Sequence, residues 1–440
     1  MKLLAILWLN LLASHPKPAV MQAQADTVKL QSYQEVVATA VKNNPTLAVY
    51  QQQIKQTHYN YKASKGFIYP NASANFNGTD NLHLAVTPIP GILLGQPGTT
   101  YYAQFGKQFI YNTGVTLTEN IFDWTSILQS QIANNNIRLN QLQQDSYLQN
   151  LRDQAGKYYF SALIAKSALK IVATDKLLAD SIVALTKQRL KEGTTDLLAV
   201  NQATINTTNI QQNQAQSQQL YDQSIENLKI LLGEQPTNEL AVAETLNLDS
   251  LVSVGIPNLG NDKNLDVYQQ QISIAALQSR SQRSTAYPKL SASAYFGAQQ
   301  FRNDFGLSFG NNAWSGYRYL GVNLTVPVFT GFTNSNKYKS ALVQKNIAQI
   351  QYNNARQQSE INDRLLLKSY TDYLHMAQAA ATSFKLYGSN LKLNQQKYQE
   401  GILSMDIYLR AFQDYLTAEN AYLNSLSQLL STRSTLLSRQ

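Results

Sequence analysis

Two long segments without proline constrain the fold of this chain more than any other feature. Residues 124–192 and 333–400 each run for about 70 residues without one. A helix rises about 1.5 Å per residue, so each segment would reach roughly 100 Å as a helix. Helices in globular proteins are usually several times shorter. The sequence therefore predicts two helices that span a large distance.

Each long segment ends in a glycine turn, after which a second helical segment returns. The turns contain Gly193 and Gly401. Apolar residues on these helices recur every seven positions, the period of left-handed coiled coils. We therefore predict two helical hairpins whose apolar stripes form seams between helices, while faces rich in Gln and Asn lie in water. The stripes are Leu409, Leu416, Leu423, Leu430 and Leu437 on one returning helix, and Ile164, Ile171, Leu178 and Leu185 on one outbound helix.

Three short motifs occur twice in the same order, which indicates an internal duplication. The spacing from the second motif to the third also agrees, since Phe122 to Gly193 is 71 positions and Phe329 to Gly401 is 72. Such agreement in order and spacing is rarely accidental, so the chain is predicted to contain two structural repeats. The paired motifs are 69–74 with 287–294, 114–122 with 321–329, and 189–193 with 397–401.

The repeats set the predicted domain boundaries. A first repeat covers residues 26–235 and a second covers 264–440, each with the order helix, β-hairpin, long helical hairpin. Residues 236–263 form a linker between the repeats, because Gly and Pro in and beside this segment interrupt regular structure.

The N-terminus has the features of an export signal. Lys2 precedes an apolar run over residues 3–13, and Ala23-Gln24-Ala25 has the small-x-small form of a cleavage site. A short membrane anchor is the alternative, but the run is about half of the roughly 20 residues that a bilayer helix needs. We therefore expect residues 1–25 to be a signal peptide and the mature chain to begin near Asp26. The absence of cysteine is compatible with an oxidising compartment.

Two predicted hairpins alternate in polarity. They pair residues 67–78 with 112–122 and 287–301 with 317–329, with long Gly-, Pro- and Asn-rich loops between the strands. Alternating small or apolar and polar residues are typical of strands with lipid on one face and a lumen on the other. Aromatic residues at strand ends fit the girdles of membrane barrels. These residues are Tyr69, Tyr111, Tyr287, Trp314, Tyr317 and Tyr319.

The strand count implies assembly. No stretch of the sequence is long and apolar enough for a spanning helix after the first 25 residues, so a membrane crossing requires a closed barrel. Four strands cannot close, because the smallest membrane barrels have about eight. Three copies would give twelve, so we predict a homotrimer. A soluble sandwich of the four strands is the alternative, and it would leave the long helices without a purpose.

Two further motifs resemble the TolC-like outer-membrane factor family. The first is the family's aromatic-x-x-Gly turn followed by Asp and a helix, to which residues 190–196 and 398–406 correspond. The second is the Leu-x-x-Pro-x-Phe-x-Gly strand exit at 324–331. The resemblance covers nearly the whole mature chain. It implies an α+β membrane protein: a trimeric twelve-stranded outer-membrane β-barrel, with four strands per protomer, continued by a periplasmic α-helical coiled-coil barrel.

The resemblance also implies a function and partners. Such a trimer is the passive outer-membrane channel of a tripartite efflux or type I secretion system, located in the outer membrane and extending into the periplasm. Its partners would be an inner-membrane pump, a periplasmic adaptor (membrane fusion) protein and outer-membrane lipid. A channel of this kind conducts what its pump delivers, so its own sequence does not specify the substrate.

The two helix turns are the candidate sites. The resemblance places adaptor docking at the turns, although the family often has Val-Gly-Leu there, and helix capping is the alternative role for the glycines. Asp196 and Asp406 follow the turns and are candidates for a periplasmic gate, with capping again the alternative. The family's second acidic gate position is Leu409 or Arg410 here. The predicted docking residues are Glu192, Gly193, Thr194, Glu400, Gly401 and Ile402.

The sequence shows no signature of an enzyme. The four histidines are far apart and no metal-ligand spacing, phosphate loop or nucleophile elbow occurs, so neither a metal nor another cofactor is expected. The formal charge of +9 comes from scattered Lys and Arg, which does not favour nucleic acid. Two other functions remain open: a periplasmic coiled-coil spacer without a pore, and a ligand-binding outer-membrane receptor.

Overall fold

The computed structural model describes residues 28–246, 259–310 and 312–440. The predicted signal peptide and residues 247–258 of the predicted linker lie outside the described residues. Among the described helices, none is both long and apolar enough to cross a bilayer. The helices are α1 (Tyr33–Asn43), α2 (Pro45–Ser64), α3 (Trp124–Lys191), α4 (Leu197–Leu232), α6 (Lys263–Ser284), α7 (Thr333–Gln399) and α8 (Met405–Ser438).

The chain divides into two compact units. We call them the turn unit and the sheet unit. Among the described residues, the turn unit consists of 28–44, 152–246 and 372–435, and the sheet unit consists of 45–151, 259–310, 312–371 and 436–440. Each unit contains segments of both predicted repeats. The long helices α3 and α7 contribute residues to both.

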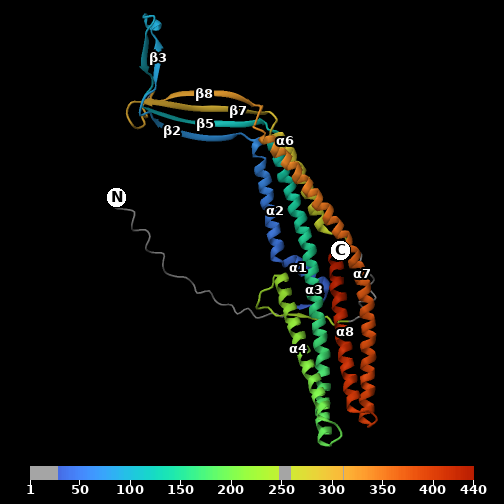
Figure 1. Cartoon of the computed structure of the whole chain (residues 1–440). Helices are drawn as coiled ribbons and strands as arrows, with labels where there is room; N and C mark the ends of the chain where they lie inside the picture. The colour runs from blue at the N-terminus through green and yellow to red at the C-terminus, as the bar shows by residue number, and fades with distance from the viewer. Residues whose placement is uncertain (1–27, 247–258, 311) are drawn as a thin grey trace, which may run out of the picture. The chain divides into compact units, whose positions relative to one another are not determined.

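The sheet unit contains one antiparallel sheet of four strands in the order β2-β5-β7-β8 (Figure 1). The strands are β2 (Asn71–Asp80), β5 (Phe109–Phe122), β7 (Lys289–Arg302) and β8 (Ser315–Thr325). Both predicted hairpins are therefore present, and β5 pairs with β7 to join them. The last strand ends at Thr325, earlier than predicted, because Pro327 cannot donate a ladder hydrogen bond.

The register confirms the alternation in polarity. Cross-strand partners share a face, as in Leu117, Ala294 and Leu320. One face is apolar along much of its length and the other carries polar and tyrosine side chains. The apolar face includes Val115, Leu117, Phe296, Leu320, Val322 and Leu324, with Asp80, Glu119, Arg302 and Arg318 nearer the strand ends, while the polar face includes Ser73, Asn75, Thr116, Ser293, Gln299 and Asn323.

A tyrosine cluster lies on the polar face. The ring of Tyr295 is buried, stacks on Tyr319 with centroids 5.6 Å apart, and contacts Tyr317. Room for this ring comes from Gly114 and Gly297, where a Cβ atom would lie 2.4 Å from the Tyr295 hydroxyl. Tyr319 lies well inside β8 and not at a strand end as predicted, whereas Tyr317 is the third residue of that strand. They lie within β8 and pack across strands.

A second hairpin replaces the loop expected between β2 and β5. Its strands are β3 (Val86–Pro90) and β4 (Thr100–Gln104), joined through the short helix η2 (Gly91–Leu94). It extends beyond the end of the sheet that is distant from the helices (Figure 1). The sequence did not reveal it, because Pro88 and Pro90 interrupt the strand pattern.

In the turn unit, parts of α3 and α7 pack with α1, α4 and α8. A parallel pair of three-residue strands, β1 (Val28–Leu30) and β6 (Leu240–Val242), lies beside them. The predicted leucine stripe of α8 is largely buried, with Leu409 and Leu430 almost inaccessible. This confirms a seven-residue seam on α8.

On α3 Ile164 of the predicted stripe is buried, but farther along the helix the seam is displaced by one residue from that stripe. The deeply buried positions are Val172, Ala179 and Thr186, which are also seven apart, whereas Leu178 lies at the edge. Val172 and Ala179 belong to the same buried cluster as the large Tyr408 and Phe412 of α8. Large and small side chains thus interdigitate between the helices.

Candidate functional site at the helix turns

Both helix turns have the same backbone structure. The N–H of Gly193 donates to the carbonyl of Leu190 and that of Thr194 donates to Arg189. In the second turn Gly401 donates to Tyr398, and Ile402 donates to the carbonyl of Lys397 in the same way. This is the Schellman arrangement that terminates helices.

The glycines are needed for their backbone angles. Gly193 has φ +69° and Gly401 has φ +75°, as the sequence predicts. No atom lies within 4 Å of a Cβ placed at either residue, so a side chain there would meet open space. The constraint is therefore conformational and not steric, and a non-glycine residue costs about 1 kcal/mol.

The two turns are joined by side chains of the turn unit. Tyr398 of α7 stacks on Tyr408 of α8 with centroids 5.4 Å apart. The guanidinium carbon of Arg189 lies 6.0 Å from the centre of the Tyr398 ring, within reach of a cation–π contact. Thr186 also lies 3.7 Å from the sulfur of Met405. The turns consequently form one structural feature and not two separate tips.

A hollow of about 560 Å³ lies between the turns, and both candidate gate residues line it. Asp196 is the N-cap of α4 and accepts a hydrogen bond of 2.9 Å from the N–H of Ala199. Asp406 lies in the first turn of α8 and is exposed. Asp196 therefore has the capping role that the sequence allowed, and both carboxyl groups remain open to solvent.

All six predicted docking residues are exposed at the turns. Glu192 accepts a hydrogen bond from Gln188 and lies 3.7 Å from Arg189, whereas the side chain of Ile402 is 70% exposed. Sequence reasoning missed a further group of exposed apolar side chains at the starts of α4 and α8. These are Leu197, Leu198 and Ile407, which resemble ordinary core positions in the sequence.

A buried pair of carboxyl groups lies deeper in the turn unit. Asp175 of α3 and Glu419 of α8 are both almost inaccessible to solvent. The hydroxyl of Tyr415 donates to Asp175 over 3.1 Å. Burial, and then the neighbouring Asp175, raise the pKa of Glu419 to about 9. Burial also raises the pKa of Asp175, so the pair holds a proton at neutral pH.

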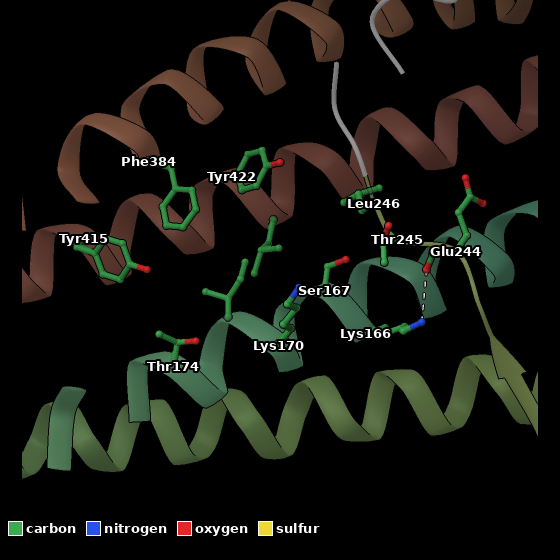
Figure 2. Close-up of a pocket in the computed structure, with 12 residues that line it drawn as sticks. Lys166, Ser167, Lys170, Thr174, Glu244, Thr245, Leu246, Phe384, Tyr415 and Tyr422 are labelled. Carbon is green, nitrogen blue, oxygen red and sulfur yellow. Dashed lines mark hydrogen bonds between the residues drawn. The ribbon is translucent and has the colours of Figure 1, made fainter. Parts of the chain in front are cut away.

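Figure 2 shows an aromatic groove close to this pair. Phe384 of α7 stacks between Tyr415 and Tyr422 of α8, with centroids 5.3 and 5.5 Å apart. Across the groove, Lys166 of α3 donates a 2.6 Å hydrogen bond to the carbonyl of Val242. That lysine anchors the segment after β6 to α3.

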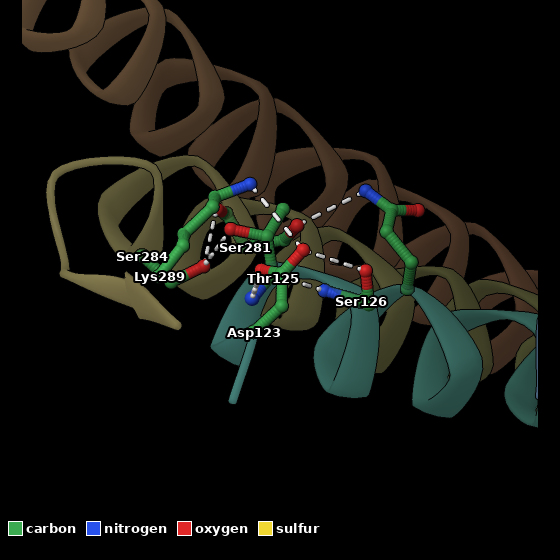
Figure 3. A network of polar contacts seen from close by, with 7 residues as sticks. Asp123, Thr125, Ser126, Ser281, Ser284 and Lys289 are labelled. Carbon is green, nitrogen blue, oxygen red and sulfur yellow. Dashed lines mark hydrogen bonds and ion pairs between the residues drawn. The ribbon is translucent and has the colours of Figure 1, made fainter. Parts of the chain in front are cut away.

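A polar network fixes the junction between strands and helices in the sheet unit (Figure 3). Asp123, between β5 and α3, accepts hydrogen bonds from the backbone of Thr125 and from the hydroxyl of Ser126. Burial acts to raise the pKa of Asp123, but the Ser126 hydrogen bonds and the charge of Lys289 outweigh it, so that pKa is lowered. The network also joins Thr125 to Ser284 of α6.

Among the described residues, no three His, Asp or Glu side chains are close enough together to hold a metal ion. Within the turn unit, exposed acidic and apolar side chains lie together at the two turns and around the hollow between them.

A family model described as outer membrane efflux protein matches residues 36–234 and 258–438. The chain therefore belongs to the outer membrane efflux protein family. This membership confirms the family resemblance, the efflux-channel function and the outer-membrane location that the sequence predicted. The family consists of transport proteins and not of enzymes.

Solved structures of outer-membrane channels share the fold. The Campylobacter jejuni CmeC outer membrane channel has 16% identity and a TM-score of 0.72, over 95% of this chain and 90% of that chain. The open state of the Neisseria gonorrhoeae MtrE outer membrane channel has 15% identity and a TM-score of 0.72, over 97% of each chain. Vibrio cholerae VceC has 16% identity and a TM-score of 0.71, over 92% of this chain and 95% of that chain. A comparison with curated protein sequences finds no match.

Proposed function

We propose that three copies of this chain form an outer-membrane channel that conducts substrates passively, with an inner-membrane pump and a periplasmic adaptor protein as partners. The open sheet carries this proposal. Among the described strands, β2 and β8 each have one neighbour, so the sheet has two free edges. In lipid, free edges leave backbone N–H and C=O groups without partners, which costs several kcal/mol for each group.

Trimer formation would satisfy both edges. Since β2 is antiparallel to β5, and each following pair is antiparallel too, β2 and β8 run in opposite directions. The β2 edge of one copy can therefore pair antiparallel with the β8 edge of the next. Three copies give twelve strands, with the apolar face toward lipid and the polar face toward a lumen.

The helix turns supply the docking surface in this proposal. Their exposed residues combine the acidic Glu192 and Glu400 with apolar groups such as Ile402. An adaptor would pack against the apolar side chains, and basic groups on the adaptor would pair with Glu192 and Glu400 at the edge of the interface. Asp196 and Asp406 would form rings of carboxylates at the periplasmic mouth, because symmetry repeats each residue three times.

The chain itself supplies a duct and no chemical step. Energy and substrate selection belong to the pump in this scheme. This assignment is supported by the family and by a set of exposed side chains at the turns that fits binding better than catalysis.

The decisive experiment measures assembly and conductance of the same preparation. Protein extracted from outer membranes into detergent should have the mass of a trimer by light scattering, and it should form ion-conducting channels in planar bilayers. A folded monomer would contradict the proposal. A trimer without conductance would instead favour the periplasmic spacer.

A further inference from the structure

The β3–β4 hairpin ends in a rigid apolar tip. The N–H of Gly91 donates to the carbonyl of Thr99 over 2.7 Å, and Gln96 donates back to Gly91 over 2.9 Å. A Cβ atom at Gly91 would lie 2.0 Å from the Thr99 hydroxyl, so this turn is tightly closed. It nevertheless leaves Leu93 74% exposed, with Ile92 similarly uncovered.

The hairpin carries no charge along its whole length. Residues 84–106 contain no Asp, Glu, Lys, Arg or His. Its large exposed side chains include Tyr102, Phe105 and those of the apolar tip. An ordered, uncharged projection with exposed apolar side chains is typical of a protein contact and not of a solvated loop.

A polar collar separates this hairpin from the apolar face of the sheet. The N–H of Asn81 donates to the carbonyl of Gln108 over 2.8 Å, and the side chain of Gln108 donates to Asp80 over 3.1 Å. Lys107 accepts a further bond from Asn81 through its carbonyl. The collar places the hairpin above the band that lipid would cover, which argues against an acyl-chain occupant.

The loop between β7 and β8 presents a second rigid apolar group. The buried amide of Gln300 holds both the N–H and the carbonyl of Ser308, at 2.9 and 2.7 Å. The N–H of Gly306 donates to the Tyr111 hydroxyl over 3.0 Å. This pinned loop leaves Phe305 85% and Phe309 84% exposed.

The proposed trimer brings these two groups together. Where β2 of one protomer pairs antiparallel with β8 of the next, the last residue of β2, Asp80, comes near the first residue of β8, Ser315. The hairpin follows β2 and the pinned loop precedes β8. We propose that the apolar tip of each β3–β4 hairpin docks on Phe305 and Phe309 of the neighbouring protomer, forming a ring of contacts outside the barrel. This inference rests on the proposed trimeric channel.

Cysteine cross-linking tests this contact directly, because the chain has no cysteine of its own. The double variant Leu93→Cys/Phe309→Cys would be oxidised in outer membranes and analysed by denaturing electrophoresis. We expect covalent trimers, formed at least about tenfold faster than any product of either single variant, since the contact holds the thiols at high effective concentration. The matched control is Leu93→Cys/Asn77→Cys, which uses an exposed residue on the polar face of β2.

The outcomes separate the inference from the proposed function. Light scattering of each variant first establishes whether the protein is a trimer. A trimer whose Leu93–Phe309 pair does not cross-link would overturn the docking contact and leave the channel intact. Cross-linking of Leu93→Cys alone would mean that hairpins meet one another, and cross-linking of the control pair would mean that they fold into the lumen. Either result overturns the inference, and a monomer overturns both proposals.

Discussion

The ammonium nitrogen of Lys289 lies 3.3 Å from Oδ2 of Asp123, which joins the first residue of β7 to the residue between β5 and α3. The same carboxylate caps α3 through the N–H of Thr125. One side chain thus fixes the start of a long helix and ties it to a strand from the other predicted repeat. Loss of the Asp123 charge should therefore weaken the junction between the strands and α3.

Asp123→Asn should lower the stability of the sheet unit by about 1 kcal/mol, because Asn can cap the helix but cannot pair with Lys289. The pKa of Asp123 is lowered from its usual 3.8. Its stabilising contribution is consequently complete above that value and is lost as the pH falls below it. Thermal unfolding followed by circular dichroism should separate wild type from variant at pH 7 and much less at pH 3. An equal separation at both values would contradict the ion-pair account.

Glu419 should give the opposite dependence on pH. Its pKa rises from 4.5 to about 9, so the folded state binds a proton that the unfolded state has released. The free energy of unfolding should therefore fall as the pH rises from about 4.5 toward 9, and level off above that. Glu419→Gln, which keeps the shape and removes the titration, should flatten the melting temperature over this range. A variant that follows the wild-type slope would exclude Glu419 as its source.

The turn glycines allow a test that separates conformation from docking. Gly193→Val and Gly401→Val should each cost about 1 kcal/mol and distort the docking surface, because valine disfavours positive φ. Gly193→Asn and Gly401→Asn are matched controls, since Asn tolerates this conformation. We expect adaptor binding, measured with purified components, to fall in the valine variants and to persist in the asparagine variants. Unchanged binding in the valine double variant would remove these turns from the docking surface.

Local features of the fold were predictable from the sequence. Gly193 and Gly401 indicate helix ends by themselves, and alternation along β2 and β8 defines two faces without knowledge of their partners. Beyond Ile164, the α3 seam was misplaced by one residue because periodicity was taken from large side chains such as Leu178. The closest packing instead involves Ala179, whose small size depends on aromatic residues supplied by other helices.

Non-local features were not predictable. Asp175 and Tyr415 are 240 residues apart in the sequence, and neither belongs to a motif that predicts their hydrogen bond in the interior. The pairing of β1 with β6 involves three residues on each side, too few for a periodic signal. The sequence predicted that Asp196 and Asp406 follow the two turns. It did not predict the hollow that both residues line, because that hollow depends on how the helical hairpins pack.

The packing around Tyr295 indicates which glycines of the sheet cannot be replaced without loss of stability. Gly114→Ala places a methyl group 2.4 Å from the Tyr295 hydroxyl and 2.9 Å from the carbonyl of Phe296, so ring and backbone must both shift. Such overpacking costs roughly 1–3 kcal/mol. The matched control is Gly316→Ala, where the nearest atom is 3.8 Å away. On heating in detergent, trimers of Gly114→Ala should dissociate at a lower temperature than wild type, and those of Gly316→Ala should not.

The last prediction concerns Asp406 and the periplasmic mouth. Its carboxylate lies in the first turn of α8 and lines the hollow between the turns, where a negative charge also favours the helix N-terminus. Asp406→Asn keeps the polar side chain at the helix start but removes the charge, so it distinguishes a helix-stabilising residue from a member of a charged ring. We expect the variant to form trimers of nearly wild-type heat resistance, with lower cation selectivity and weaker block by multivalent cations in planar bilayers. The measurement should be made at low salt, where the Debye length is longest and a ring of charge acts most strongly. Asp196→Asn serves as the comparison, because Asn can still cap α4 through its side-chain oxygen, so this variant also removes a charge at the hollow without removing the cap. If selectivity and block are unchanged in Asp406→Asn, the residue stabilises its helix and takes no part in the gate.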